Sequence, residues 1–290
     1  MVIGGTSQSS LSPYDPITPS PAGHFSAVPM GFLTDTTLCI GCKACEVACK
    51  QWNQLPMDDF GWTGHSYDNT GDLGATTWRH VAFVERMHDD LGRRPTSLQA
   101  FQSNWLMMSD VCKHCVHAGC LEACPTGAIV RTEFDTVIIQ QDICNGCGYC
   151  VPACPFGVPE LSVADHKAHK CTLCYDRLKG GLEPACAKAC PTDSIQFGPI
   201  EVLTDRARDR VSSLHDRGVD GAYIYGDRSV GGTNGIDGLN AFFILTAPPE
   251  VYNLPDQPEL PQRKSIPGYL SALGAGLAFA LAAALSLRER

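Results

Sequence analysis

The chain has 290 residues, with 31 acidic and 22 basic residues and a formal net charge of −9. This acidic balance disfavours nucleic acid as a partner. We find no Gly-rich phosphate loop, nucleophile elbow or dinucleotide fingerprint in the sequence. The sixteen cysteines therefore carry the chemical information in this chain.

The first thirty residues have the composition of an extended arm. Residues 1–30 are rich in Ser, Pro and Gly and contain neither Lys nor Arg. A secretory signal begins with a basic segment, so we expect no such signal here. The composition favours an arm that is disordered or lies over a partner.

The cysteines fall into four groups of four, each opening with C-x2-C and closing with C-x3-C. The groups are Cys39, Cys42, Cys45 and Cys49; Cys112, Cys115, Cys120 and Cys124; Cys144, Cys147, Cys150 and Cys154; and Cys171, Cys174, Cys186 and Cys190. A proline follows every group except the first. The third group reproduces the C-x2-C-x2-C-x3-C-P pattern of bacterial [4Fe–4S] ferredoxins. The sequence therefore predicts four [4Fe–4S] clusters, with all sixteen cysteines as iron ligands.

Two other uses of cysteine compete with this interpretation. Disulfide frameworks occur mainly in short secreted domains, and this chain is long. Four C-x2-C pairs could form zinc ribbons, which would make the chain a zinc-stapled structural protein. Zinc does not require the third and fourth cysteines at these offsets or the repeated Cys-Pro, so it is the remote alternative.

An insertion over residues 51–111 separates the first two groups and holds all four tryptophans. Thr76–Glu85 and Gln102–Ser109 have the composition of strands joined by a polar loop, which predicts a β-hairpin. The tryptophans indicate either a small satellite core or a docking surface for a partner subunit.

The middle groups enclose residues 126–131 and 134–139, which are rich in β-branched residues and predict two short strands. This is the strand pair of one ferredoxin-like unit. The first and fourth groups then form a second unit around it, with Ser194–Phe197 as its last strand. The predicted fold class is α+β, with two nested ferredoxin-like 2[4Fe–4S] units, an inserted β-hairpin region and a single C-terminal transmembrane helix.

Nesting predicts which cysteines share a cluster. The four sets are Cys39, Cys42, Cys45 with Cys190; Cys171, Cys174, Cys186 with Cys49; Cys112, Cys115, Cys120 with Cys154; and Cys144, Cys147, Cys150 with Cys124. The alternative is sequential pairing of the first group with the second and the third with the fourth. The long insertion between the first two groups disfavours that alternative without removing it.

Four histidines lie close to the cysteine groups, namely His114, His117, His166 and His169. Histidine can replace cysteine at an iron–sulfur cluster. Each group already supplies four thiolates, so we expect the histidines to lie at the surface or behind the ligands.

Two lysines and three glycines lie in or beside the ligand loops. Lys43 and Lys170 adjoin ligands, and a nearby cation would raise a cluster's reduction potential. Gly41, Gly146 and Gly148 occupy positions where we expect the backbone to approach inorganic sulfide too closely for a side chain.

Three segments of different composition follow the cysteine groups. Apolar residues at helical spacing predict an amphipathic helix from Val202 to Leu214, followed by strands at Tyr223–Tyr225 and Phe242–Leu245. Five prolines in residues 247–261 predict an extended linker. Ser265–Leu287 contains no charged residue and is about as long as one membrane span. The alternative for this last segment is an Ala-rich helix packed against a neighbour.

These patterns divide the chain into five segments. They are an arm (1–30), a four-cluster core (31–200, with the insertion 51–111), a helix-strand extension (201–247), a Pro-rich linker (248–264) and a membrane anchor (265–288). Basic residues are balanced on both sides of the anchor, so the positive-inside rule does not decide its orientation.

Three stretches resemble one family. They are G-F-L-T-D-T-T-L-C-I-G-C-K-A-C-E-V-A-C-K-Q-W-N from Gly31, H-K-C-T-L-C-Y-D-R-L-K-G-G-L-E-P-A-C-A-K-A-C-P-T-D-S-I-Q-F-G from His169, and A-P-P-E-V-Y-N-L-P from Ala247. All three resemble the iron–sulfur (beta) subunit of respiratory formate dehydrogenases. The cysteine framework alone also resembles four-cluster subunits of dimethyl sulfoxide reductases, nitrite-linked systems and some hydrogenases.

The resemblance implies an electron-transfer subunit that is not an enzyme by itself. Its expected partners are a catalytic alpha subunit with a molybdenum or tungsten pterin, and a membrane cytochrome b or other quinone-reducing subunit. The anchor helix would contact membrane lipid, with the cluster domain on the outer, periplasmic-type face. The alternative is the same relay in a sulfoxide reductase-type molybdopterin oxidoreductase or a hydrogenase.

Overall fold

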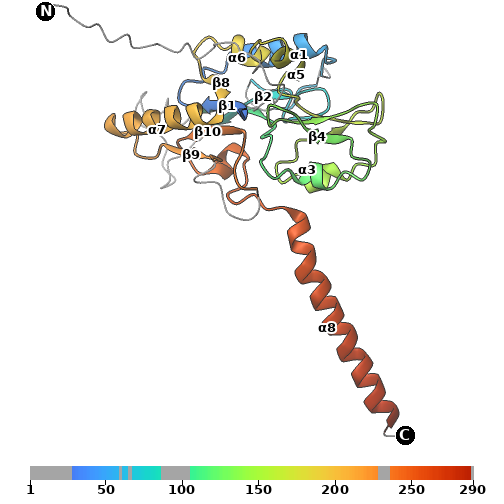
Figure 1. The fold of residues 1–290 in the computed structure, drawn as a ribbon. Helices are drawn as coiled ribbons and strands as arrows, with labels where there is room; N and C mark the ends of the chain where they lie inside the picture. The colour runs from blue at the N-terminus through green and yellow to red at the C-terminus, as the bar shows by residue number, and fades with distance from the viewer. Residues whose placement is uncertain (1–27, 59–60, 65–66, 86–104, 228–235, 289–290) are drawn as a thin grey trace, which may run out of the picture.

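The computed structural model describes residues 28–58, 61–64, 67–85, 105–227 and 236–288. A central sheet lies between a group of short helices at one end and a long C-terminal helix that projects from the other (Figure 1). The elements are β1 (Met30–Asp35), α1 (Ala44–Asn53), β2 (Arg79–Glu85), β3 (Trp105–Val111), α3 (Gly119–Glu122), β4 (Ile129–Arg131), β5 (Val137–Ile139), α4 (Cys150–Ala153), β6 (Glu160–Leu161), β7 (Ala168–His169), α5 (Tyr175–Lys179), α6 (Ala185–Lys188), β8 (Ile195–Pro199), α7 (Ile200–Asp216), β9 (Tyr223–Tyr225), β10 (Ala241–Leu245), the 3₁₀ helix η1 (Pro249–Tyr252) and α8 (Pro261–Arg288).

The central sheet joins segments that are far apart in the sequence. Its strand order is β8-β1-β10-β9. β1 pairs antiparallel with β8 and parallel with β10, so Phe32 lies opposite both Phe197 and Ala241. All six residues of β1 are buried. The strand before the first cysteine group is thus held by the strand after the fourth group.

The expected strands form, with shifted boundaries. β2 and β3 pair antiparallel in the insertion, from Arg79 opposite Val111 to Glu85 opposite Trp105. Residues 102–104, where the second strand was expected to begin, lie outside the described residues. β4 and β5 also pair, but five residues connect them instead of the expected two. A hydrogen bond from Thr132 N–H to Thr136 O at 2.8 Å closes this turn, in which Asp135 adopts φ 60°.

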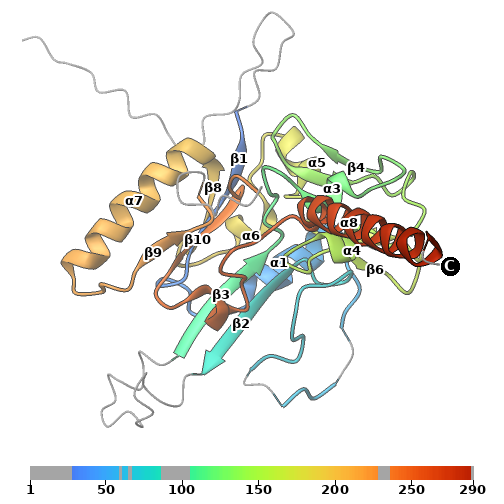
Figure 2. The ribbon, with the colours of Figure 1, turned by 90° about the horizontal axis from the view of Figure 1, so that it is seen from below.

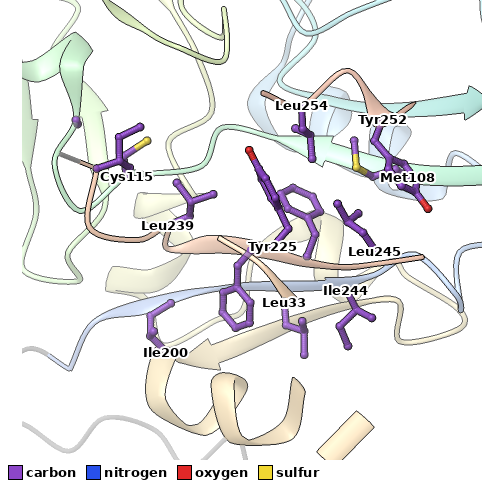
Figure 3. Close-up of a cluster of buried hydrophobic side chains, with 14 of the residues drawn as sticks. Leu33, Met108, Cys115, Ile200, Tyr225, Leu239, Ile244, Leu245, Tyr252 and Leu254 are labelled. Carbon is purple, nitrogen blue, oxygen red and sulfur yellow. The ribbon is translucent and has the colours of Figure 1, made fainter. Parts of the chain in front are cut away.

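The predicted amphipathic helix is α7, which covers one face of the sheet (Figures 1 and 2). Leu203, Ala207 and Leu214 are buried on its inner face. They join a core that includes Leu33, Ile244 and Leu245 of the sheet and extends to Cys115 (Figure 3). The core therefore reaches from the sheet to the second cysteine group.

Leu203 and its neighbour Val202 offer a matched test of this packing. Leu203→Ala removes a fully buried side chain and should lower the free energy of unfolding by about 2–5 kcal/mol. Val202 is 47% exposed, and Val202→Ala should change it by no more than about 0.5 kcal/mol. Denaturant unfolding of both variants checks the difference, and equal effects would contradict the assigned inner face of α7.

The Pro-rich segment is not uniformly extended. Pro249–Tyr252 forms η1, and α8 already begins at Pro261, before the expected position 265. Proline suits the first turn of a helix because its missing N–H has no partner there. Tyr252, Leu254 and Leu260 are buried, so apolar residues between the prolines fasten this segment to the core.

Candidate metal centre

All sixteen cysteines are free thiols. The ligand loops lead into short helices, so that α1, α3, α4 and α6 each carry cysteines near their ends. Cys42 and Cys147 are exposed, whereas the other fourteen are buried or partly buried. Buried thiols without disulfides are suited to holding a group that bonds to sulfur.

Cys190 lies beside the first cysteine group. Burial raises the pKa of Cys39, and negative charge on Cys45, Cys190 and Cys42 raises it further. The structure thus brings together three cysteines of the first group and the last cysteine of the fourth. The contact between α1 and α6 and the pairing of β1 with β8 position these segments.

Cys49 lies with the fourth group instead of with its own. Burial raises its pKa, and charge on Cys186 and Cys174 raises it further. Burial likewise raises the pKa of Cys171, where Cys49 is the strongest charged neighbour. The end of α1 therefore places Cys49 among Cys171, Cys174 and Cys186.

Cys154, the last cysteine of the third group, lies near the second group. Burial raises the pKa of Cys115, followed by charge on Cys154, Cys112 and Cys120. These four cysteines line a single enclosed cavity, which α3 and the Cys-Pro turn after α4 help to close.

The remaining set gathers around Cys150. Burial raises its pKa to about 11, and charge on Cys144, Cys147 and Cys124 raises it as well. Some thiols also lie near a second set, since Cys45 has Cys186 and Cys171 has Cys112 among its charged neighbours.

The chemistry of the donors suits an iron–sulfur cluster, because the candidate ligands are free thiols that occur in groups of four. Within the described ranges, no three His, Cys, Asp or Glu side chains are arranged to hold one metal ion. Zinc would need its thiolates at about 2.3 Å from one centre. A cubane separates its four thiolates because each binds a different iron. The free and mostly buried thiols of these loops fit the type of cluster that the sequence predicts.

Two of the three loop glycines, Gly41 and Gly146, are closely surrounded by protein atoms. Gly41 and Gly146 have φ of 66° and 75°, a region that favours glycine. A Cβ on Gly41 would lie 2.6 Å from the Phe83 ring, and one on Gly146 would lie 2.1 Å from His166 O. Neighbouring protein atoms, and not only sulfide, exclude side chains at these positions.

The four histidines differ in burial. His117 and His166 are exposed and His169 is partly buried, but His114 is fully buried. Val137 N–H donates to His114 Nδ1 at 3.1 Å, which places the proton on Nε2. Burial and the nearby Lys170 lower the pKa of His114 well below its usual value, so the ring is neutral. His114 lines the same cavity as Cys112 and Cys115 without being needed as a ligand.

The cations nearest the thiols are only partly those expected. Lys43 is partly exposed and its ammonium pairs with Asp68 at 3.2 Å and Glu46 at 3.4 Å, so local carboxylates offset its charge. Lys170 is buried and donates to Val137 O and Cys171 O. The expectation of a tuning cation therefore suits Lys170 better than Lys43.

Sequence reasoning missed two other buried cations, Arg79 and Lys113. Lys113 lies between Cys112 and Cys115, so its place in the sequence could have indicated a cation near the ligands. Arg79 is far in sequence from every cysteine, so no local pattern indicated it. Burial tends to lower the pKa of Arg79, but negative charge on Cys186, Cys45 and other thiols raises it overall.

The aromatic residues of the insertion serve two roles. Trp105 packs against Tyr67 and Phe83 at centroid distances of 5.3 and 6.5 Å, which forms a small satellite cluster. Trp62 is 92% exposed. Trp52 lies at the surface, where its indole N–H donates to Asp176 at 2.8 Å. Packing and surface exposure therefore coexist in this segment.

The C-terminal helix α8 leaves the molecule beside the middle cysteine groups. Gln262 donates to Gly119 O of α3 at 3.0 Å, so α8 begins next to α3 and then projects away from the rest of the molecule (Figure 1). The helices α1, α5 and α6 lie at the opposite end of the molecule (Figure 1). In the part of the chain that the structure describes, Gly268–Leu287 is the one helix segment long and apolar enough to cross a membrane, with a mean hydropathy of 2.0.

Comparison with known proteins identifies the family. Residues 103–200 match the family described as 4Fe-4S dicluster domain. The chain is 39% identical over 272 residues to the formate dehydrogenase-O iron-sulfur subunit of Escherichia coli, covering 91% of this chain and 85% of that protein.

Two further relatives have similar descriptions. The formate dehydrogenase iron-sulfur subunit of Haemophilus influenzae is 39% identical over 84% of this chain and 74% of its own length. The B subunit of the anaerobic dimethyl sulfoxide reductase of Escherichia coli is 32% identical over 62% of this chain and 78% of its own length. The expected resemblance is confirmed: the chain belongs to the family of formate dehydrogenase iron–sulfur subunits, which transfer electrons and are not catalytic subunits.

Proposed function

We propose that this chain relays electrons within a formate dehydrogenase complex through four [4Fe–4S] clusters in two nested units. The proposed ligand sets are Cys39, Cys42, Cys45, Cys190; Cys49, Cys171, Cys174, Cys186; Cys112, Cys115, Cys120, Cys154; and Cys124, Cys144, Cys147, Cys150. The position of Cys190 beside the first group is the observation that carries this proposal. Sequential pairing would leave Cys190 far from those ligands.

Each bound cluster would supply a one-electron carrier. The chain's own contribution is to hold the ligands at fixed positions and to keep water from most of them. Buried Lys170 supplies positive charge near the inner thiols, which favours the reduced form of a nearby carrier, whereas Asp110 partly offsets the charge of Lys113.

The two exposed cysteines suggest where electrons enter and leave. Cys42 lies between exposed Ile40 and Val47, and Cys147 lies between exposed Ile143 and Tyr149. An apolar surface around a ligand loop suits a partner that must approach closely. We assign the catalytic pterin-containing subunit to the Cys42 end and a quinone-reducing membrane subunit to the Cys147 end.

The position of α8 supports this assignment of the two partner subunits to the two ends of the molecule. α8 begins beside α3, so the middle cysteine groups would lie nearest the bilayer. We propose that 265–288 is a single-pass anchor. The cluster core would be 31–200, with 51–111 as an inserted β-hairpin region. Residues 201–247 and 248–264 would join the core to the anchor. The arm at 1–30 would contact a partner.

The test is to purify the complex and measure formate-dependent reduction of an artificial dye, together with iron and labile sulfide. We expect formate-dependent activity in the complex and about sixteen irons per copy of this chain beyond those of the partners. Activity with a sulfoxide or hydrogen in place of formate would instead favour the alternative complexes. About four zincs without sulfide would exclude a relay.

A further inference from the structure

The side chain of Arg79 is buried, and its hydrogen-bond donors have no partners among the described residues. It is the first residue of β2, and its side chain is 1% exposed. None of its three guanidinium nitrogens has a hydrogen-bond partner among the described residues. The Phe32 ring lies 4.9 Å from the guanidinium carbon and covers one face of it. A buried guanidinium has five N–H donors to satisfy, so this arrangement requires acceptors that no described protein atom supplies within hydrogen-bond distance.

The other buried cations do not share this property. Lys113 donates to the Asp110 carboxylate. Lys170 donates to two backbone carbonyls. Their donors are at least partly satisfied by the chain itself, so their burial needs no additional acceptor. Among the buried cations of the described residues, Arg79 alone has every side-chain nitrogen without a partner.

The surroundings of Arg79 are thiols from two different ligand sets. The guanidinium lies within electrostatic reach of Cys45, Cys49, Cys171 and Cys186. Cys45 belongs to one of the two outer sets, and the other three belong to the second. β2 contacts α1, which carries Cys45 and Cys49 and runs beside it (Figure 2). Arg79 therefore lies at the junction between two neighbouring cluster positions.

We propose that Arg79 is a positioning residue of the relay that donates N–H groups to sulfur atoms of both outer clusters and holds both reduction potentials higher. This inference rests on the proposed ligand sets. Reduction adds one negative charge to a cluster, and a fixed cation with donors to sulfur stabilises that charge. A planar guanidinium can direct donors to two sides at once, which a lysine ammonium cannot do with the same geometry.

The experiment is an EPR-monitored redox titration of the complex carrying Arg79→Gln, Arg79→Lys or Arg208→Gln, with iron and sulfide measured on each sample. Arg208 is exposed on α7, so its loss removes the same charge away from the ligands. Arg79→Gln should shift the reduced-to-oxidised ratio of both outer clusters by at least tenfold at a given potential, about 59 mV downward for one electron. The two inner clusters and all clusters of Arg208→Gln should keep their potentials.

Arg79→Lys retains the charge but fewer donors, so we expect a smaller shift that is unequal between the two outer clusters. If Arg79→Gln does not bind iron, the potentials of the Arg79→Lys variant alone test the proposed role of Arg79. Unchanged outer potentials at full iron content, or an equal shift of all four clusters, would overturn the role of Arg79. The cluster count of the wild-type sample and its formate-dependent activity report separately on the proposed function.

Discussion

Replacing Cys190 with alanine is expected to damage the cluster whose other ligands are Cys39, Cys42 and Cys45. Cys190 lies beside these three thiols, and no other cysteine replaces it there in the proposed assignment. The iron content should fall from about sixteen per chain by between one and four, depending on whether one iron or the whole cluster is lost. Iron analysis and EPR of the reduced protein measure this change.

A second variant makes the Cys190 result specific. Cys49→Ala should damage the cluster of Cys171, Cys174 and Cys186, although Cys49 is close in sequence to the first group. The two variants should therefore lose different EPR signals and keep both inner clusters. If Cys190→Ala removed the cluster of Cys171, Cys174 and Cys186, the nested assignment would be wrong.

Ending the chain after Leu260 is expected to release it from membranes when it is produced without its partner subunits. This change removes all of α8, whose span Gly268–Leu287 has no buried residues in the structure. The folded part keeps Tyr252, Leu254 and Leu260, which are buried in the core. Membrane fractionation should therefore move the protein to the soluble fraction with its iron content unchanged.

A single substitution tests the same segment without truncation. Leu277 lies near the middle of the span, and Leu277→Arg should disfavour insertion by about 2.5–3.5 kcal/mol, or roughly a hundredfold in partitioning. Leu277→Ala is the matched control and should leave the protein largely in the membrane fraction. Full membrane retention of both the arginine variant and the truncated chain would show that another segment provides the attachment.

The ligand pattern was the most predictable part of the molecule. Thiolates at C-x2-C spacing are constrained by the cluster they hold, so local sequence reports the chemistry directly. The amphipathic period of α7 and the β-branched residues of β4 and β5 were similarly visible. Each of these features depends on neighbours within a few residues.

Features that depend on distant partners could not be predicted. Nothing near Phe242 indicates that β10 enters the sheet parallel to β1, between β1 and β9. The role of Arg79 is also invisible locally, because β2 brings it to thiols that lie elsewhere in the sequence. Likewise, Lys43 looked suitable as a tuning cation until the fold placed Asp68 against it.

The position of β1 in the sheet has a consequence for biosynthesis. Asp35 O accepts a hydrogen bond from Ser194, 159 residues later, and Thr36 donates to Ile244, 208 residues later. At a synthesis rate of about 5–20 residues per second, β1 waits roughly 10–40 s for its partners. During that time the apolar side chains of Phe32 and Leu33 and the unpaired edges of β1 are open to other nascent chains. We therefore expect the yield of folded protein to depend on the speed of translation as well as on native stability.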